Sequence, residues 1–372
     1  MTVGPSTIII DFGAYSSVFT DYHNELFSMP TVIGRMNPNR NVLCALDLQT
    51  NRGIWFGDVA LSKSSILDIT VPLKSGIFAN KDDISELINH ICCHEMCICP
   101  EMNNFFFPEH LGVPLSQRKF VSELLFEQEK INAVAFDKSI YMPIFLSQSP
   151  NVTVIDSGDS CTEIATFCDQ KGNKDYVKKL DIGAQDITKF IVNVNKDKVP
   201  DLSDFTALKI AHDIKRDICG FEEKEGKYQK HIQVEFVLPD NSKIAFGDER
   251  LQAPEILFDP KIASKEGKGV SDEVIALIMK NKEEDRPKLY NNIMLCGGNA
   301  NMHGLTQKLQ TMISSHENVT AHVHVSKSER PYNDICAGAK VYSRLSTFNL
   351  FVDKQRYEEN GPNVALYWSS DI

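Results

Sequence analysis

The sequence has no hydrophobic run long enough to cross a membrane and no excess of basic residues. Its first apolar run, Ile8–Ile10, is short and follows no basic segment, which argues against a signal peptide or a membrane span. The formal net charge of -11 argues against general binding of nucleic acid or anionic membranes, because phosphate surfaces demand basic patches. We therefore expect an intracellular protein that contacts neither nucleic acid nor lipid directly.

The sequence also lacks short-period repeats, proline-rich tracts and low-complexity segments. Its 372 residues predict two domains, since about 150 residues per domain is a soft average. A hydrophobic content of 42% and a charged content of 24% are typical of a globular protein with a full core. The 10 cysteines are expected to be reduced thiols inside the cell and not a disulfide framework.

What the sequence does contain is a repeated pattern of an apolar strand, an aspartate, one further residue and a glycine. The pattern occurs at Ile8–Gly13 and at Val152–Gly158, and a third apolar run, Ile293–Asn299, contains a glycine pair. Each run predicts a buried strand that ends in a sharp turn. Two such turns facing each other could grip phosphate oxygens with backbone N–H groups while the carboxylates order water around a divalent cation. The pattern predicts a duplicated nucleotide clamp.

Strands and helices alternate through both halves, which is typical of an α/β fold built twice. Periodicity predicts return strands within Ser17–Phe27, a hairpin of Val234–Leu238 with Lys243–Phe246, and helices at Lys81–Cys93, Arg118–Ile131, Leu208–Cys219, Ser271–Met279 and Leu305–Ile313. We expect the last helix to begin at the glycine loop and to direct its positive end toward phosphate.

Several longer runs are more specific, and they lie in order along the chain: Asp213–Lys215, Phe246–Arg250, Pro254–Phe258, Leu295–Gly298, Leu345–Phe348 and Lys354–Pro362. In these runs, and over nearly its whole length, the sequence resembles the actin family. The resemblance implies the duplicated α/β fold that actin shares with heat-shock chaperones and sugar kinases. In that fold two large domains, each with two subdomains, surround a cleft for ATP or ADP with Mg²⁺ or Ca²⁺.

The resemblance also implies domain boundaries. The first half is expected to comprise residues 1–145 plus 334–372, with a mobile lobe at about 33–69. The second half is expected to comprise residues 146–333, with an outer subdomain at about 182–268.

The actin-like runs assign roles to individual residues. The nucleotide-binding residues implied by the resemblance are Asp11, Gly13, Ala14, Asp156, Ser157, Gly158, Asp159, Lys215, Gly297, Gly298, Asn299 and Met302. Asp11 and Asp156 would hold the metal through water, and Asp156 is also a catalytic candidate.

The departures from the actin pattern predict weaker nucleotide chemistry. In the first turn Ala14 replaces a hydroxyl, Tyr15 a glycine and Val18 a lysine, so we expect lower affinity than in actin. Ser139 stands where actin has the glutamine that positions the attacking water, and Glu163 replaces a histidine. Because hydrolysis depends on placing that water in line, we expect it to be weak or absent.

A separate cluster combines His90, Cys92, Cys93, His94, Cys97 and Cys99. His90, His94 and Cys97 fall on one face of a helix, a spacing that could ligate zinc. The alternative is a plain helix and its exit loop with free thiols, as the resemblance to actin implies. The sequence leaves both interpretations open.

The segments that correspond to actin's filament contacts have also changed. Lys261–Lys268 holds one isoleucine among charged and small residues, so it offers little apolar area for a lateral contact. Val42–Gln49 keeps its apolar residues, and Met1–Ser6 lacks an acidic cluster.

The sequence therefore predicts an actin-like, complex-forming or cytoskeletal protein of the cytoplasm, or alternatively of the nucleus. Its partners would be other actin-family subunits or a cytoskeletal or chromatin complex. Whether it polymerises stays open, and the alternative is a conventional filament-forming ATPase. A small-molecule kinase on the same fold is a weaker reading, because the actin-like tail argues against it.

Overall fold

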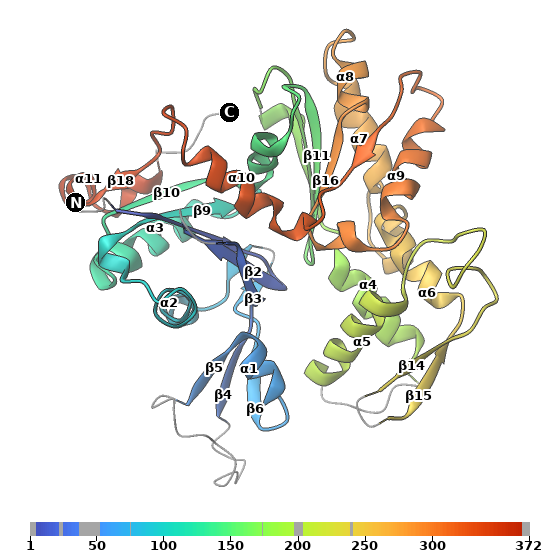
Figure 1. The fold of residues 1–372 in the computed structure, drawn as a ribbon, viewed down its shortest axis with the longest axis horizontal. Coiled ribbons are helices and arrows are strands. Elements are labelled where there is room, and N and C mark those ends of the chain that lie inside the picture. Colours follow the sequence, from blue (N-terminus) through green and yellow to red (C-terminus); the bar gives the residue numbers. More distant parts are fainter. Residues whose placement is uncertain are drawn as a thin grey trace. The chain divides into compact units, whose positions relative to one another are not determined.

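A computed structural model describes residues 5–21, 25–36, 53–74, 76–172, 174–196, 204–238 and 241–366, with the side chains of 204–208 and 365–366 left aside. The chain forms two compact units: unit 1 is Met1–Leu146 with Ile335–Asp371, and unit 2 lies within Ser147–Asp334 (Figure 1). The predicted lobe segment Val42–Gln49 lies outside the described residues. Among the helices of the described residues, none has the length and apolar character needed to cross a membrane.

Unit 1 is built on a six-stranded sheet in the order β18-β10-β9-β1-β2-β3. Its strands are β1 (Thr7–Phe12), β2 (Ser16–Thr20), β3 (Phe27–Pro30), β9 (Asn104–Glu109), β10 (Ala133–Lys138) and β18 (Val352–Asp353). Strands β1, β2 and β3 form an antiparallel meander, while β9 runs parallel to both β1 and β10. The apolar run Ile8–Ile10 forms the centre of β1 because it is buried on both faces.

Helices cover this sheet, and smaller elements extend unit 1 (Figure 1). The helices are α1 (Gly57–Ser62), α2 (Lys81–His90), α3 (Leu115–Glu123), α10 (Asp334–Tyr342) and α11 (Lys354–Asn360), and the further strands are β4 (Ile33–Met36), β5 (Ile54–Phe56), β6 (Leu67–Thr70), β7 (Leu73–Lys74) and β8 (Ile77–Phe78). Helices α2 and α3 occupy the predicted helical segments, but each passes into a π-helical turn, at Ile91–Glu95 and Leu124–Gln128. The element β5-β4-β6 with α1 has a small core of its own, centred on Trp55.

Unit 2 repeats the strand arrangement of unit 1. Its five-stranded sheet has the order β13-β12-β11-β16-β17. The strands are β11 (Val152–Ser157), β12 (Thr162–Phe167), β13 (Val177–Leu180), β16 (Ile293–Cys296) and β17 (Val325–Ser326). Here too three strands form an antiparallel meander, and the first of them pairs in parallel with a strand from a later segment. The predicted duplicated α/β class is therefore confirmed.

The remaining elements of unit 2 pack around this sheet. They are α4 (Ala184–Val194), α5 (Asp204–Ile218), β14 (Val234–Val237), β15 (Lys243–Phe246), α6 (Glu249–Gln252), α7 (Val270–Met279), α8 (Arg286–Tyr290) and α9 (Leu305–Ser314). The predicted hairpin is present as the antiparallel pair β14 and β15. One continuous core joins sheet and helices, and it includes Ile155, Ile187, Val274 and Leu309.

Two local predictions differ from the structure. Strands β1 and β11 each run one residue past the aspartate, because Asp11 and Asp156 pair in register with residues of the returning strand. The second return strand, β3, begins at Phe27, where the sequence predicts it to end. Helix α9 begins at Leu305, as predicted, and a 3-10 turn followed by the left-handed Gly304, with φ of 79°, separates it from the glycine pair.

Candidate functional site

The turn that joins β11 to β12, Asp156–Cys161, is braced from inside by buried polar side chains. The Asn299 amide donates to the Ser157 hydroxyl at 3.0 Å and to the Gly158 carbonyl at 2.9 Å. The Ser157 hydroxyl also lies 3.0 Å from that of Thr162. Because these contacts engage the side chains of Ser157 and Asn299, both residues hold the turn in shape, and we call this segment the unit 2 turn.

The two glycines after β16 lie in different surroundings. Gly297 has a φ of 85°, and a Cβ atom there would stand 2.4 Å from the Ser157 carbonyl oxygen and 2.6 Å from an oxygen of Asp156. Only a glycine permits this close approach of two backbone segments. A Cβ atom at Gly298 would meet no atom within 4 Å. Gly298 is exposed and borders open space next to Gly297.

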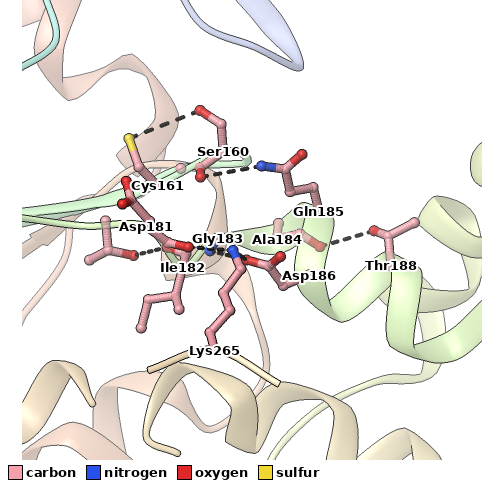
Figure 2. A network of polar contacts seen from close by, with 12 residues as sticks. Ser160, Cys161, Asp181, Ile182, Gly183, Ala184, Gln185, Asp186, Thr188 and Lys265 are labelled. Carbon is pink, nitrogen blue, oxygen red and sulfur yellow. Dashed lines mark hydrogen bonds and ion pairs between the residues drawn. The ribbon is translucent and has the colours of Figure 1, made fainter. Parts of the chain in front are cut away.

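The first residues of α4 hold the unit 2 turn from another side (Figure 2). The amide of Ala184 donates to the Gly158 carbonyl at 3.1 Å, and the amide of Gln185 donates to the Asp159 carbonyl at 2.9 Å. A Cβ atom at Gly183 would lie 2.3 Å from the Asp159 carbonyl oxygen, so the helix start and the turn are in direct contact. These amides orient the turn, and within it the Gly158 amide donates to the Cys161 carbonyl at 3.0 Å.

A buried cation lies next to the unit 2 turn. The Nζ atom of Lys215 is 3.8 Å from a carboxylate oxygen of Asp159 and donates to the Ala184 carbonyl at 3.4 Å. Burial lowers the pKa of Lys215, and the attraction of Asp159 offsets only part of that effect. Burial likewise raises the pKa of Asp159 against the opposing pull of Lys215. Lys215 and Asp159 thus form a largely buried pair of opposite charges beside the turn.

The corresponding turn of unit 1 follows β1. The Thr31 hydroxyl donates to the Gly13 carbonyl at 2.8 Å and lies 2.9 Å from the Ser17 hydroxyl. Neither Gly13 nor Tyr15 has a positive φ, so the glycine-to-tyrosine change does not strain this turn, contrary to expectation. Val18 is buried in β2, and no cation therefore takes the place of the lysine at that position.

The remaining predicted residues of unit 1 are mostly buried as well. Asp11 is 8% exposed, so its carboxylate has limited access to solvent. Ser139 is fully buried, and its hydroxyl lies 3.4 Å from Nδ1 of His110. This contact holds the short Ser139 side chain inside unit 1.

In unit 2, Asp156 and Glu163 stand directly opposite each other on β11 and β12. Directly opposite residues project to the same face of a sheet, so two carboxylates are placed side by side. Both residues are buried, at 5% and 0% exposure. A carboxylate at position 163 thus adds negative charge beside Asp156, where actin has a histidine.

Met302 and Arg216 neighbour predicted nucleotide-binding residues in the sequence. Met302 follows the 3-10 turn Gly298–Asn301 and packs against the core of unit 2. Arg216, which follows Lys215, is exposed and forms ion pairs with Asp213 at 3.1 Å and with Asp217 at 2.8 Å.

Two residues that the sequence reading missed support this site, Asp186 and Lys265. Asp186 lies three residues after Gly183 at the start of α4, and its carboxylate accepts the Gly183 amide at 3.0 Å. This contact is half of a capping box, and because Gly183 has no side chain the sequence lacks the Ser/Thr-x-x-Glu/Gln pattern that would mark it. Lys265 contacts Asp186 from a loop that is distant in the sequence, and no sequence pattern predicts this ion pair.

The cysteine and histidine cluster in unit 1 does not converge on a metal site. No three of the ligand atoms of His90, Cys93, His94 and Cys97, all described residues, lie within 4.8 Å of one another. The His90 ring stacks on Phe56 at 4.3 Å, and its Nε2 atom lies 3.2 Å from Glu95. The π-helical turn after α2 breaks the regular helical spacing on which the zinc interpretation depends.

Comparison with protein families finds a match that extends along most of the chain. The family model described as Actin matches residues 4–366, which is nearly the whole chain. The match covers both turns, the glycine pair and the C-terminal helix α11.

Proposed function

Since the chain belongs to the actin family, we propose that it binds ATP or ADP with a divalent cation and serves as a subunit of a cytoskeletal or other multiprotein complex. The observation that carries this proposal is the unit 2 turn, which buried groups brace on several sides and which has open space at Gly298. Backbone N–H groups of such a turn suit phosphate oxygens, although that of Gly158 donates to the Cys161 carbonyl here.

The residues proposed to hold the nucleotide belong to two sets. In unit 2 they are the backbone of Ser157, Gly158 and Asp159, the ammonium group of Lys215, the glycine pair and the region from Asn299 to Met302. In unit 1 they are Asp11, Gly13 and Ala14. The cation, Mg²⁺ or Ca²⁺, takes oxygen ligands, and we propose that Asp11 and Asp156 hold it through water.

We further propose that hydrolysis is slow or absent. Ser139 is too short to position water as a glutamine would, and its hydroxyl is held near His110. Glu163 adds negative charge beside Asp156, which opposes the gathering of charge around an attacked phosphate. Nucleotide then serves as a switch or as a structural ligand.

The test begins with the nucleotide content of the purified protein, followed by single-turnover hydrolysis with Mg²⁺. Stoichiometric ATP that is released unchanged is the expected result. Bound ADP with continuing phosphate release would contradict the inference from Ser139 and indicate a conventional ATPase. Protein that carries no nucleotide and does not bind added ATP would refute the proposal as a whole.

The double variant Ser139→Gln with Glu163→His tests the reason given for slow hydrolysis. If these two positions limit water attack, single-turnover hydrolysis is expected to rise about tenfold or more, since each tenfold gain lowers the barrier by about 1.4 kcal/mol. Both sites are buried, so the melting temperature and the nucleotide content are measured as controls for folding. A folded, ATP-bound double variant with an unchanged rate would show that another step limits hydrolysis.

The partners we propose are other actin-family subunits or a cytoskeletal or chromatin complex, in the cytoplasm or the nucleus. The exposed, charged loop Lys261–Lys268 weighs against the lateral contacts of a conventional filament. High-speed sedimentation over a range of concentrations distinguishes a complex-forming subunit from a conventional filament-forming protein. The protein is expected to stay in the supernatant, and concentration-dependent pelleting with phosphate release would favour a filament-forming ATPase.

A further inference from the structure

The loop Lys261–Lys268, which leads into α7, is ordered by local contacts in its first half. The 3-10 turn Pro260–Ala263 begins at Asp259, and Ser264 follows in the left-handed conformation with φ of 55°. The amide of Lys265 then donates to the Pro260 carbonyl at 3.1 Å. This path brings the Lys265 side chain back toward the body of unit 2, while its neighbours Ser264 and Glu266 are exposed.

The Lys265 ammonium group ends at the start of α4 (Figure 2). Its Nζ atom lies 2.7 Å from a carboxylate oxygen of Asp186 and also donates to the Asp181 carbonyl. The Asp186 side chain is 4% exposed and the Lys265 side chain 33%. The same Asp186 oxygen accepts the Gly183 amide at 3.0 Å. One carboxylate therefore joins the surface loop to the residue that begins the helix.

From this helix start the contacts continue directly into the unit 2 turn. The amides of Ala184 and Gln185 donate to the carbonyls of Gly158 and Asp159. The Gln185 side chain also donates to the Ser160 carbonyl at 3.3 Å. Lys265 is thus linked to the turn through one ion pair and a short series of hydrogen bonds, all within unit 2.

We propose that Lys265 is a positioning residue that couples the loop 261–268 to the unit 2 turn. Without the ammonium group a nearly buried carboxylate would lose its cation, and the helix start that orients the turn would be free to shift. This inference rests on the proposed nucleotide binding at the turn. Because coupling between two sites is reciprocal, nucleotide at the turn stabilises the loop to the same degree that the loop stabilises nucleotide binding.

A consequence concerns partners that bind the loop. Any protein that pulls Lys265 away from Asp186 speeds nucleotide release, and any that presses the loop inward slows it. In this chain the loop therefore acts on the nucleotide through a charge contact and not through a buried apolar tip.

The test uses the full chain and three variants, Lys265→Met, Lys265→Arg and Lys268→Met. Lys268 is exposed on the same loop and is the matched control for loss of a lysine. Dissociation of a fluorescent ATP analogue is expected to be about 5- to 10-fold faster in Lys265→Met, near the lower end of known couplings. Lys265→Arg restores most of the wild-type rate, and Lys268→Met leaves it unchanged. A role in stability alone would lower the melting temperature without changing this rate.

Hydrogen exchange of the amides of residues 262–268 provides a second readout, independent of nucleotide dissociation. ATP is expected to slow exchange of these amides in the wild-type protein and not in Lys265→Met. If wild-type protein binds ATP but the loop exchanges equally with and without it, the coupling is refuted while the proposed function stands. Equal dissociation rates in Lys265→Met and wild type would refute it as well. Failure of the wild-type protein to bind ATP would refute both proposals.

Discussion

Gly297 and Gly298 are adjacent, but their surroundings are opposite. Gly297 has φ of 85° and touches the backbone of Ser157, whereas Gly298 borders open space. Gly297→Ala is therefore expected to lower the free energy of unfolding by about 2–4 kcal/mol, from backbone strain and a backbone clash. Gly298→Ala keeps wild-type stability but weakens ATP binding about tenfold, roughly 1.4 kcal/mol, by filling ligand space.

Urea unfolding and ATP titration of both variants separate these effects. Each glycine variant serves as the control for the other, since both add a single methyl group at neighbouring positions. A Gly298→Ala protein that binds ATP as tightly as wild type would show that the nucleotide does not occupy the space beside this residue.

The residues of the candidate site could be predicted from the sequence, but the contacts that support them could not. The aspartates, the glycine pair and Lys215 could be proposed because they lie in short runs that match a known family. The supporting contacts could not be found in this way. Asn299 meets Ser157 across 142 positions, and Lys265 meets Asp186 across 79. Only the folded chain brings such partners together, and no local pattern encodes the pairing.

Strand β9 and helix α3 are joined by a buried ion pair in unit 1. The Nε atom of Arg118 lies 2.5 Å from Glu109, and the two side chains are 2% and 8% exposed. Burial raises the pKa of Glu109 even though Arg118 pulls it down. Arg118→Met would leave this buried carboxylate without its cation and is expected to lower the free energy of unfolding by about 3–5 kcal/mol.

The pH dependence of Arg118→Met has a definite sign. Since the folded-state pKa of Glu109 is raised and would rise further without Arg118, the penalty grows as pH increases through the acidic range. Unfolding in urea should therefore show a smaller loss at pH 5 than at pH 7.5. The double variant Arg118→Met with Glu109→Leu is expected to recover most of the stability. An equal loss at both pH values would argue against a stranded carboxylate as the cause.

Helix α5 contains a histidine whose protonation opposes folding. Burial lowers the pKa of His212 to about 3, and the nearby Lys215 and Arg216 add to the effect while Asp217 opposes it. Because the unfolded chain takes up this proton near pH 6.5, stability present above that pH is lost as pH falls. From pH 7.5 to pH 5 this group alone removes about 2 kcal/mol.

His212→Gln tests this sign, because glutamine does not titrate. The variant is expected to lose about 2 kcal/mol less than wild type between pH 7.5 and pH 5, measured as the change in unfolding free energy in urea. His324→Gln, at an exposed position, is the control for loss of a histidine. The same acid-induced loss in His212→Gln and wild type would contradict the assignment.

At the scale of elements, the helices that could be predicted are those with a buried face and regular apolar spacing. Helices α2 and α3 follow their apolar spacing, but their continuation as π-helical turns does not, because such turns are set by packing at the helix end. The start of α9 at Leu305 was predicted, but the conformation of the residue before it was not. Gly304 adopts a left-handed conformation against Phe221, where a Cβ atom would come within 3.1 Å, and this contact comes from a distant segment.

At the scale of the whole molecule, the two units have separate cores. One core gathers residues such as Phe105 and Leu125 of unit 1, and the other gathers residues such as Ile155 and Leu295 of unit 2. The duplication of the fold, although not its strand order, was predicted from the repeated strand, aspartate and glycine pattern. The pattern is visible because it is short and contiguous in each half.

Unit 1, unlike unit 2, is assembled from two separate stretches of chain. Strand β18 pairs with the edge of β10, and Tyr357 of α11 stacks on Phe126 at 4.3 Å. Val352, Tyr357 and Val364 all belong to the unit 1 core. A ribosome therefore finishes every residue of unit 2 before it supplies the last pieces of unit 1.

Throughout that interval the nascent chain carries an unpaired strand edge on β10 and an uncovered aromatic ring at Phe126, a combination that invites aggregation. A chain stopped after Asp334 is expected to yield a protease-resistant unit 2 and a readily cleaved unit 1. Resistance of both units would show that unit 1 can fold without its final segment. The protein is therefore most prone to aggregate during its synthesis. A chaperone bound to the incomplete unit 1 would protect it until the C-terminal segment has been made.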